Sequence, residues 1–209
     1  MTHDELIDPY LYNIFFKEYK VNENDVAISL GAGEGEEVQY LSERVGPNGK
    51  VFAIEADPRV FAVLQDNISR YKYKNVIPLN IAIADFEGSI NIVDLGGNGE
   101  ANYIQKEESN NSVSVQCTTM DKFVSDYKLD KIDYIKVNIE GAEVEFLKGF
   151  QEKYQIIKNW CISCHDFTGV ESQKTFAFVT NYFKERNVEF RTYEDLPFPI
   201  GEFYVFVSN

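Results

Sequence analysis

The chain has 209 residues, of which 44% are hydrophobic and 14% aromatic, a composition that can fill the core of one domain. Its 34 acidic residues outnumber its 20 lysines and arginines, so the formal net charge is −14. This charge opposes counterion release on nucleic acids and anionic membranes, and we therefore expect neither as a partner.

The N-terminal residues show no targeting signal. Asp4, Glu5 and Asp8 stand where a secretory signal needs basic and then apolar residues. No later stretch approaches about 18 uninterrupted apolar residues, the length of a transmembrane helix. We therefore expect a cytoplasmic protein without a membrane span.

The first predicted helix lies in an N-terminal segment that covers residues 1–24. Asp8 is a helix N-cap residue, and Pro9 follows at the first helical position. Ile14 and Phe15 then fall on one apolar helical face. This aromatic-rich segment is predicted to dock onto the rest of a single domain that spans residues 1–209.

From Val26 onward, short apolar stretches alternate with amphipathic helical ones. Such alternation is typical of βαβ units, and it predicts a doubly wound, mostly parallel α/β sheet. The expected helices cover residues 36–45, 58–71, 119–127, 143–154 and 172–185. The seven expected strands of the sheet cover residues 26–30, 51–55, 76–82, 134–138, 160–164, 189–192 and 203–207.

The last two strands are predicted to form a C-terminal antiparallel hairpin at the edge of the sheet. Two further short strands, 90–93 and 113–117, flank a stretch rich in Gly, Asn and Ser. This stretch, residues 94–112, cannot pack a core, so we expect a mobile polar loop inserted into the domain.

Three cysteines, Cys117, Cys161 and Cys164, are too few for a disulfide framework in a chain of this length. Cys161 and Cys164 match C-x-x-C, but they lie in a predicted strand, where positions three apart point to opposite faces. The pattern therefore favours separate buried thiols over a redox pair or a shared zinc ion.

A glycine-rich turn, Gly31, Gly33 and Gly35, joins the first strand of the alternation to its helix. Glycines there let backbone N–H groups approach a ligand closely. A dinucleotide fingerprint would need glycine at position 36, which is Glu36. Acidic side chains crowd the helix start and would repel a pyrophosphate, so a cofactor without phosphates fits better. These are Glu34, Glu36 and Glu37.

Twenty residues beyond Gly35, the next strand ends in Glu55. A carboxylate there can accept hydrogen bonds from both hydroxyls of a ribose. S-adenosylmethionine has that ribose and no phosphate, so it is the expected cofactor. A plain tight turn with a surface glutamate is the simpler alternative.

The segment "DKIDYIKVNIEGAEVEFLKGF", Asp130 to Phe150, resembles the hallmark of FkbM-type methyltransferases, a family of class I S-adenosylmethionine-dependent enzymes. The family typically reads I-D-x-I-K-I-D-V-E-G-A-E, followed by L-K-G. The positions that match are Ile132, Asp133, Ile135, Lys136, Glu140, Gly141, Ala142, Glu143, Leu147, Lys148 and Gly149. The resemblance extends from about Val26 to His165.

The resemblance implies a Rossmann-like sheet with a final antiparallel hairpin, and methyl transfer mainly to hydroxyl oxygens of sugars and natural products. It places the cofactor on the glycine turn and the neighbouring strand ends. The expected cofactor-binding residues are Ser29, Gly31, Ala32, Gly33, Gly35, Glu55, Ala56, Ala82, Ile83 and Asn138.

The chain departs from the family pattern at three of these positions. The family favours Asp at the Ser29 position, where the acid helps to hold the cationic amino end of the cofactor. It also favours Asn at the Gly33 position and Asp at the Asn138 position. Two missing carboxylates predict weaker attraction of the cationic cofactor, although Glu34 and Glu55 remain nearby.

Lys136, Asn138 and Glu140 alternate with apolar residues, so they share one face if their strand continues that far. Ligands of such sheets lie beyond the carboxyl ends of the strands. His165 is expected at the end of the neighbouring strand. These four residues are the predicted catalytic group.

Three roles stay open for this group. His165 can remove the proton of an acceptor hydroxyl, because its ordinary pKa lies nearest neutrality. Glu140 can orient His165, act as the base itself, or join Asn138 and His165 as ligands of a divalent metal. Alternatively, His165 has only a structural role. Glu143 is expected to be an ordinary first-turn carboxylate of its helix.

The sequence therefore predicts an S-adenosylmethionine-dependent O-methyltransferase that acts on a hydroxyl of a sugar or another polar metabolite. One alternative is a cofactor-binding scaffold protein of the same fold without turnover. A nicotinamide-dependent oxidoreductase is the other, and the glycine spacing disfavours it. The expected partner is a small-molecule or carbohydrate acceptor; the oligomeric state is left open.

Overall fold

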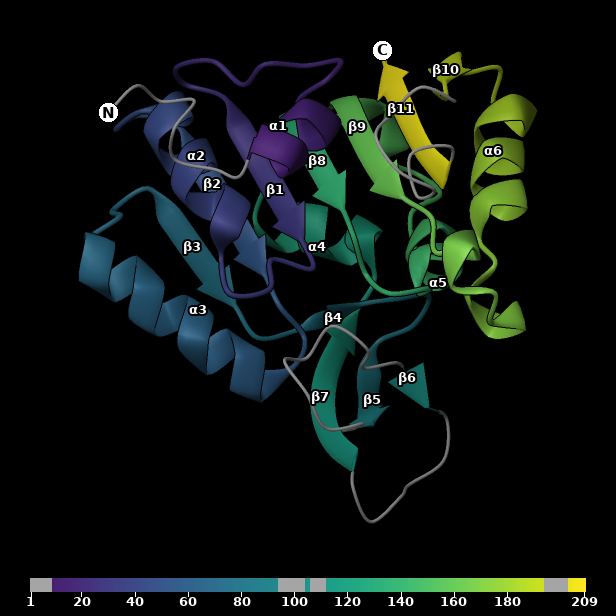
Figure 1. The fold of residues 1–209 in the computed structure, drawn as a ribbon, viewed down its shortest axis with the longest axis horizontal. Helices are drawn as coiled ribbons and strands as arrows, with labels where there is room; N and C mark the ends of the chain where they lie inside the picture. Colours follow the sequence, from purple (N-terminus) through teal and green to yellow (C-terminus); the bar gives the residue numbers. More distant parts are fainter. Residues whose placement is uncertain (1–8, 94–103, 106–111, 194–202) are drawn as a thin grey trace.

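The computed structural model describes residues 9–93, 104–105, 112–193 and 203–209 (Figure 1). Its main sheet has seven strands in the order β10-β11-β9-β8-β1-β2-β3. These strands are β1 (Val26–Leu30), β2 (Lys50–Ile54), β3 (Val76–Leu79), β8 (Ile132–Val137), β9 (Ile157–Ser163), β10 (Phe190–Arg191) and β11 (Tyr204–Ser208).

The strands β3, β2, β1, β8 and β9 pair in parallel, whereas β11 pairs antiparallel with both β9 and β10. The predicted fold class is therefore confirmed: a Rossmann-like sheet that ends in an antiparallel hairpin. The second strand of the hairpin, β11, inserts between β9 and β10, which leaves β10 at the edge.

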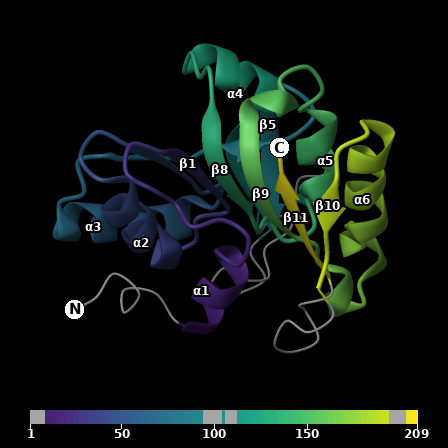
Figure 2. The same ribbon diagram turned by 90° about the horizontal axis from the view of Figure 1, so that it is seen from above.

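Helices cover both faces of the main sheet (Figure 2). They are α1 (Pro9–Phe15), α2 (Glu36–Val45), α3 (Pro58–Tyr71), α4 (Met120–Asp126), α5 (Glu143–Lys148) and α6 (Phe176–Glu185). Residues of α1, α2 and α3 share one buried cluster, and residues of α4, α5 and α6 share the other. Successive strand residues point to opposite clusters: in β8, Tyr134 belongs to the first and Ile135 to the second.

Two helices are several residues shorter than predicted. Helix α5 ends at Lys148, and Gly149 follows it in close contact with Ala84, whose carbonyl oxygen would lie 1.9 Å from an added Cβ. Helix α6 begins at Phe176 instead of residue 172. The Asp166 carboxylate accepts hydrogen bonds from the backbone N–H groups of Thr175 and Phe176, both at 2.9 Å, and so fixes this start.

A second, four-stranded sheet has the order β4-β7-β5-β6. Its strands are β4 (Ala82–Ile83), β5 (Gly88–Val93), β6 (Ile104–Gln105) and β7 (Ser112–Thr118). The predicted strand over 76–82 is therefore divided between two sheets. Figure 1 shows the small sheet below the main one, where the strands β1 and β8 end. The predicted polar loop at 94–112 contains β6, and its residues 94–103 and 106–111 lie outside the described residues.

All three cysteines are free and buried, as predicted. Cys161 packs in the cluster of α1, α2 and α3, whereas Cys164 packs in the cluster of α4, α5 and α6, which confirms that they face opposite sides. The predicted N-cap, Asp8, lies outside the described residues. Among the described helices, none has the length and apolar character needed to cross a membrane.

Candidate functional site

A cavity of about 680 Å³ lies at the carboxyl ends of β1, β2 and β8, with residues of the small sheet in its wall. Ten of the predicted site residues line it. They are Gly31, Ala32, Gly33, Glu55, Ala56, Ala82, Ile83, Lys136, Asn138 and Glu140. Ser29, Gly35 and His165 are not in the wall of this cavity. Ser29 and His165 contact residues that are, Glu37 and Glu140.

The glycines of the turn serve different purposes. Gly31 has φ +75°, and a Cβ on it would lie 1.9 Å from the carbonyl oxygen of Asn138, so only glycine lets these strand ends approach. Gly33 also has positive φ, and a Cβ there would meet nothing within 4 Å. Gly35 packs against Leu64 of α3, which makes its role structural.

Glu55 is fixed at the end of β2 by backbone donors. Its Oε2 accepts a hydrogen bond from Gly33 N at 2.9 Å, and its Oε1 accepts one from Asp57 N at 2.9 Å. Burial raises the pKa of the Glu55 carboxyl above its ordinary value, although both backbone donors and the charge of Lys136 oppose this shift. The carboxylate is thus held against the glycine turn in the cavity wall.

A buried cluster lies between β1, β8 and α2, and we name it the Lys136 cluster: Ser29, Glu37 and Lys136. The Ser29 hydroxyl donates a hydrogen bond to Glu37 Oε1. The same carboxylate oxygen lies 3.0 Å from Lys136 Nζ, which donates a hydrogen bond to the carbonyl oxygen of Gly31 at 2.6 Å. All three side chains are buried. Lys136 is therefore tied to the glycine turn.

Glu37 was not among the predicted site residues, because the sequence pattern did not distinguish it from Glu34 and Glu36 at the helix start. Glu34 and Glu36 are exposed, but Glu37 is only 4% exposed. A signal was available in the helical spacing. Glu37 lies next to Val38 and four residues before Leu41, so it falls on the buried face of α2.

Lys136, Asn138 and Glu140 would share a strand face only if the strand continued to Glu140, and it does not, because β8 ends at Val137. Glu140 and Gly141 instead form a left-handed turn, with φ values of +54° and +96°. Such a conformation is strained for a glutamate and is found disproportionately at functional sites. The turn still brings Glu140 to the cavity that Lys136 and Asn138 line.

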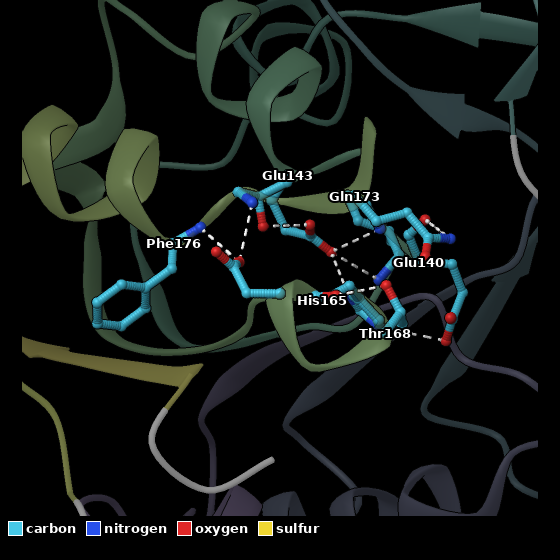
Figure 3. A network of polar contacts seen from close by, with 10 residues as sticks. Glu140, Glu143, His165, Thr168, Gln173 and Phe176 are labelled. Carbon is cyan, nitrogen blue, oxygen red and sulfur yellow. Dashed lines mark hydrogen bonds and ion pairs between the residues drawn. The ribbon is translucent and has the colours of Figure 1, made fainter. Parts of the chain in front are cut away.

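A second buried cluster follows the end of β9, and we name it the His165 cluster: Glu140, Glu143, His165 and Thr175 (Figure 3). His165 Nδ1 lies 3.0 Å from Glu143 Oε1, and Nε2 lies 3.4 Å from Glu140 Oε1. The Thr175 hydroxyl donates a hydrogen bond to Glu143 Oε2 at 2.9 Å. His165 and Glu143 are buried, whereas the Glu140 side chain is 31% exposed.

Glu143 is more than the first-turn carboxylate that the sequence suggested. Its Oε1 also receives the backbone N–H groups of Ile139 and Gly141, at 3.4 Å and 3.3 Å. It therefore braces the turn that carries Glu140 and the ring of His165 at once. Its position at the start of α5 was visible in the sequence, but its burial depends on α6 and the segment after β9.

The two carboxylates determine the charge of His165. Burial lowers the pKa of His165, but the hydrogen bonds and charges of Glu140 and Glu143 outweigh this effect and raise the pKa to about 9. The imidazole is therefore protonated at neutral pH. A general base must be unprotonated, so the predicted role of His165 as the base does not fit this charge state.

The metal alternative names Asn138, Glu140 and His165 as ligands. Within the described ranges, no three His, Cys, Asp or Glu side chains are grouped in a way that could hold a metal ion, but a set that includes Asn138 is not of this kind. Asn138 and Glu140 both line the cavity, but His165 uses its ring nitrogens on two carboxylates.

Solved structures share this fold. Methyltransferase FkbM from Methylobacillus flagellatus superposes with a TM-score of 0.63 at 16% identity, over 99% of this chain and 49% of that one. Fibrillarin from Aeropyrum pernix, solved with natively bound S-adenosyl-L-methionine, superposes with a TM-score of 0.50 at 14% identity, over 95% and 72%.

The cavity fits S-adenosylmethionine. Its volume lies in the range of small-molecule sites. A fixed carboxylate, Glu55, is available for the ribose hydroxyls, and Ile54 and Ile83 offer apolar surface for the adenine. The Glu37 and Lys136 pair offers both charges to a zwitterionic amino-acid end.

Two curated relatives are methyltransferases named for sugar chemistry or for a 2-O position. Hexuronic acid methyltransferase AglP of Haloferax volcanii is 27% identical over 148 residues, which are 70% of this chain and 58% of that protein. 2-O-methyltransferase NoeI of Sinorhizobium fredii is 23% identical over 143 residues, which are 61% and 58%.

The chain thus spans somewhat over half the length of these relatives. The sequence profile of the Methyltransferase FkbM domain matches residues 29–191, which include the glycine turn, both buried clusters and most of the main sheet. The chain therefore belongs to the FkbM methyltransferase family, whose members use S-adenosylmethionine.

Proposed function

We propose that this methyltransferase transfers the methyl group to a hydroxyl oxygen of a sugar or another polar small molecule. The observation that carries the proposal is the Glu140 carboxylate, which lines the cofactor cavity and is held from behind by His165 and Glu143. The names of the two relatives, one acting on hexuronic acid and the other at a 2-O position, support an oxygen acceptor and a sugar.

The residues of the cavity divide into those that hold the cofactor and those that meet the acceptor. Bound S-adenosylmethionine supplies an electrophilic methyl group on a sulfonium sulfur. The glycine turn, Glu55, Ala56, Ala82 and Ile83 would hold its nucleoside. Most of the catalytic work is then to position the acceptor oxygen and to exclude water.

Glu140 is the proposed proton acceptor. Its carboxylate faces the cavity, so an acceptor hydroxyl can donate a hydrogen bond to it and pass on the proton as the oxygen becomes methylated. His165 is a positioning residue, because its imidazolium holds Glu140 Oε1 at 3.4 Å and is itself held by Glu143 at 3.0 Å. Lys136 serves the glycine turn, not the proton transfer.

The sequence left open a scaffold protein without turnover, and Ser29 and Asn138 motivated it. The buried Glu37 carboxylate beside Ser29 weakens that argument, because an acid is present in the cavity wall after all. The chain belongs to a methyltransferase family, which argues against the alternative of a nicotinamide-dependent oxidoreductase.

The test is turnover of a panel of hexuronic acids, hexoses and their glycosides, followed by the release of S-adenosylhomocysteine. Glu140→Gln should lower kcat by roughly 10²- to 10⁴-fold, the usual contribution of a general base, and leave cofactor affinity unchanged. Glu145→Gln, in the helix α5 that follows Glu140 and outside the cavity, is the matched control. Full turnover in Glu140→Gln would refute the assignment.

The pH dependence of kcat distinguishes Glu140 from His165 as the general base. With a cationic His165 behind Glu140, kcat should stay level from pH 6.5 and fall as the pH passes about 9. If His165 were the base, kcat would instead rise up to that pH. A metal role would show as loss of activity in EDTA and recovery with Mg²⁺. Cofactor binding without turnover of any acceptor would favour the scaffold.

A further inference from the structure

Glu37 is a buried carboxylate in the wall of the cofactor cavity. Burying a carboxylate costs several kcal/mol unless it is paired, so its place in the wall calls for an explanation. It comes from α2, whereas the strand beside it presents a serine, Ser29, whose side chain is buried beneath it.

The two oxygens of the Glu37 carboxylate have different surroundings. Oε1 receives the Ser29 hydroxyl and lies 3.0 Å from Lys136 Nζ. No donor among the described residues reaches Oε2. Since Glu37 lines the cavity, Oε2 is the oxygen of this carboxylate that is left for a ligand.

The charge balance of the Lys136 cluster also favours the binding of a zwitterion, such as the amino-acid end of the cofactor. Lys136 and Glu37 balance each other, so the Lys136 cluster is neutral in the unliganded protein. Ser29 and Lys136 are register partners on adjacent strands, and apolar neighbours surround them: Ala53 beside Ser29, and Cys161 beside Lys136. In such a poorly solvated place, a hydrogen bond to a charged group is stronger than in water.

We propose that Glu37 accepts, through Oε2, hydrogen bonds from the ammonium group of the cofactor's amino-acid end. Ser29 and Lys136 hold Oε1 and thereby turn Oε2 toward the cavity. An acid carried by helix α2 then does what an acid at position 29 would do from the strand. A carboxylate at position 29 would face Glu37 directly, so the serine is the residue that this arrangement needs.

This role differs from a purely structural one, in which the ion pair only fixes the glycine turn. The structural role affects every ligand of the cavity, whereas the proposed role affects only ligands that carry the ammonium. S-adenosylhomocysteine carries it. 5′-Methylthioadenosine has the same nucleoside and a thioether but lacks the amino acid.

The experiment is calorimetric titration of both ligands into wild type, Glu37→Gln and Glu43→Gln. Glu37→Gln should weaken S-adenosylhomocysteine about 10- to 100-fold, the effect of a lost charged hydrogen bond, and leave 5′-methylthioadenosine unchanged. Glu43→Gln, an exposed glutamate of the same helix outside the cavity wall, should change neither. No acceptor is involved, so the result does not depend on the proposed methyl acceptor.

Glu37→Gln leaves Lys136 without its carboxylate and can impair folding. A second variant, Glu37→Asp, keeps a carboxylate for Lys136 but shortens the side chain, and it is measured in the same way, with unchanged 5′-methylthioadenosine binding as evidence of an intact cavity. Equal loss of both ligands, or no loss of S-adenosylhomocysteine, would overturn the proposal. Selective loss of S-adenosylhomocysteine in either variant supports it.

Discussion

The Lys136 cluster and the His165 cluster lie on opposite faces of the main sheet and reach the same cavity. The first contacts the helices α1 and α2, and its single carboxylate balances a single cation. The second contacts α5 and the start of α6, and it sets two carboxylates against one imidazolium. The first is thus neutral, and the second carries an excess negative charge at the group that faces the cavity.

The different net charges of the two clusters suit them to different roles. A neutral ion pair can receive a zwitterion without leaving either charge unpaired. A carboxylate that exceeds the available positive charge can accept a proton and become neutral. Buried ion pairs contribute little to stability on balance, so their placement at a cavity indicates function more than folding.

The largest expected effect on stability comes from breaking the His165 cluster at Glu143. Glu143→Gln leaves His165 and Thr175 without their carboxylate and should lower the free energy of unfolding by about 3 kcal/mol. Urea unfolding measures this change. Glu145→Gln, two residues along the same helix, should stay within about 0.5 kcal/mol of wild type. Equal stability of the two variants would show that the cluster is not a unit.

A smaller effect should appear in the pH dependence of stability. The pKa of His165 is raised from 6.5 to about 9 in the folded protein, so its protonation stabilises the fold fully below pH 6.5. That contribution should fall by a few kcal/mol as the pH rises toward 9. The measurement is the stability difference between wild type and His165→Asn across this range. A difference that does not change with pH would mean that His165 is neutral.

The smallest of the three effects concerns the ribose. Glu55→Ala removes a carboxylate that Gly33 N and Asp57 N hold in the cavity wall. It should weaken S-adenosylhomocysteine by about 2 kcal/mol, roughly 30-fold. Unlike Glu37→Gln, it should weaken 5′-methylthioadenosine equally, since both ligands carry the ribose. Unchanged affinity for both would place the nucleoside elsewhere.

The sequence was sufficient for the sheet and for most of the cavity. Alternating apolar segments and helices fix a parallel sheet, and the carboxyl ends of its strands fix where Glu55 and Asn138 lie. The charge state of His165 was out of reach, because it depends on Glu140 and Glu143, which come from a different part of the chain. The left-handed turn at Glu140 was also not predicted, since nothing in the strand pattern showed that β8 would end at Val137.

The most direct test of separate roles for the two clusters is the affinity of Glu37→Gln and Glu140→Gln for S-adenosylhomocysteine, measured side by side. If the roles are separate, Glu37→Gln should bind S-adenosylhomocysteine about 10- to 100-fold more weakly, whereas Glu140→Gln should bind it like wild type. Equal losses in both variants, or a loss confined to Glu140→Gln, would contradict separate roles.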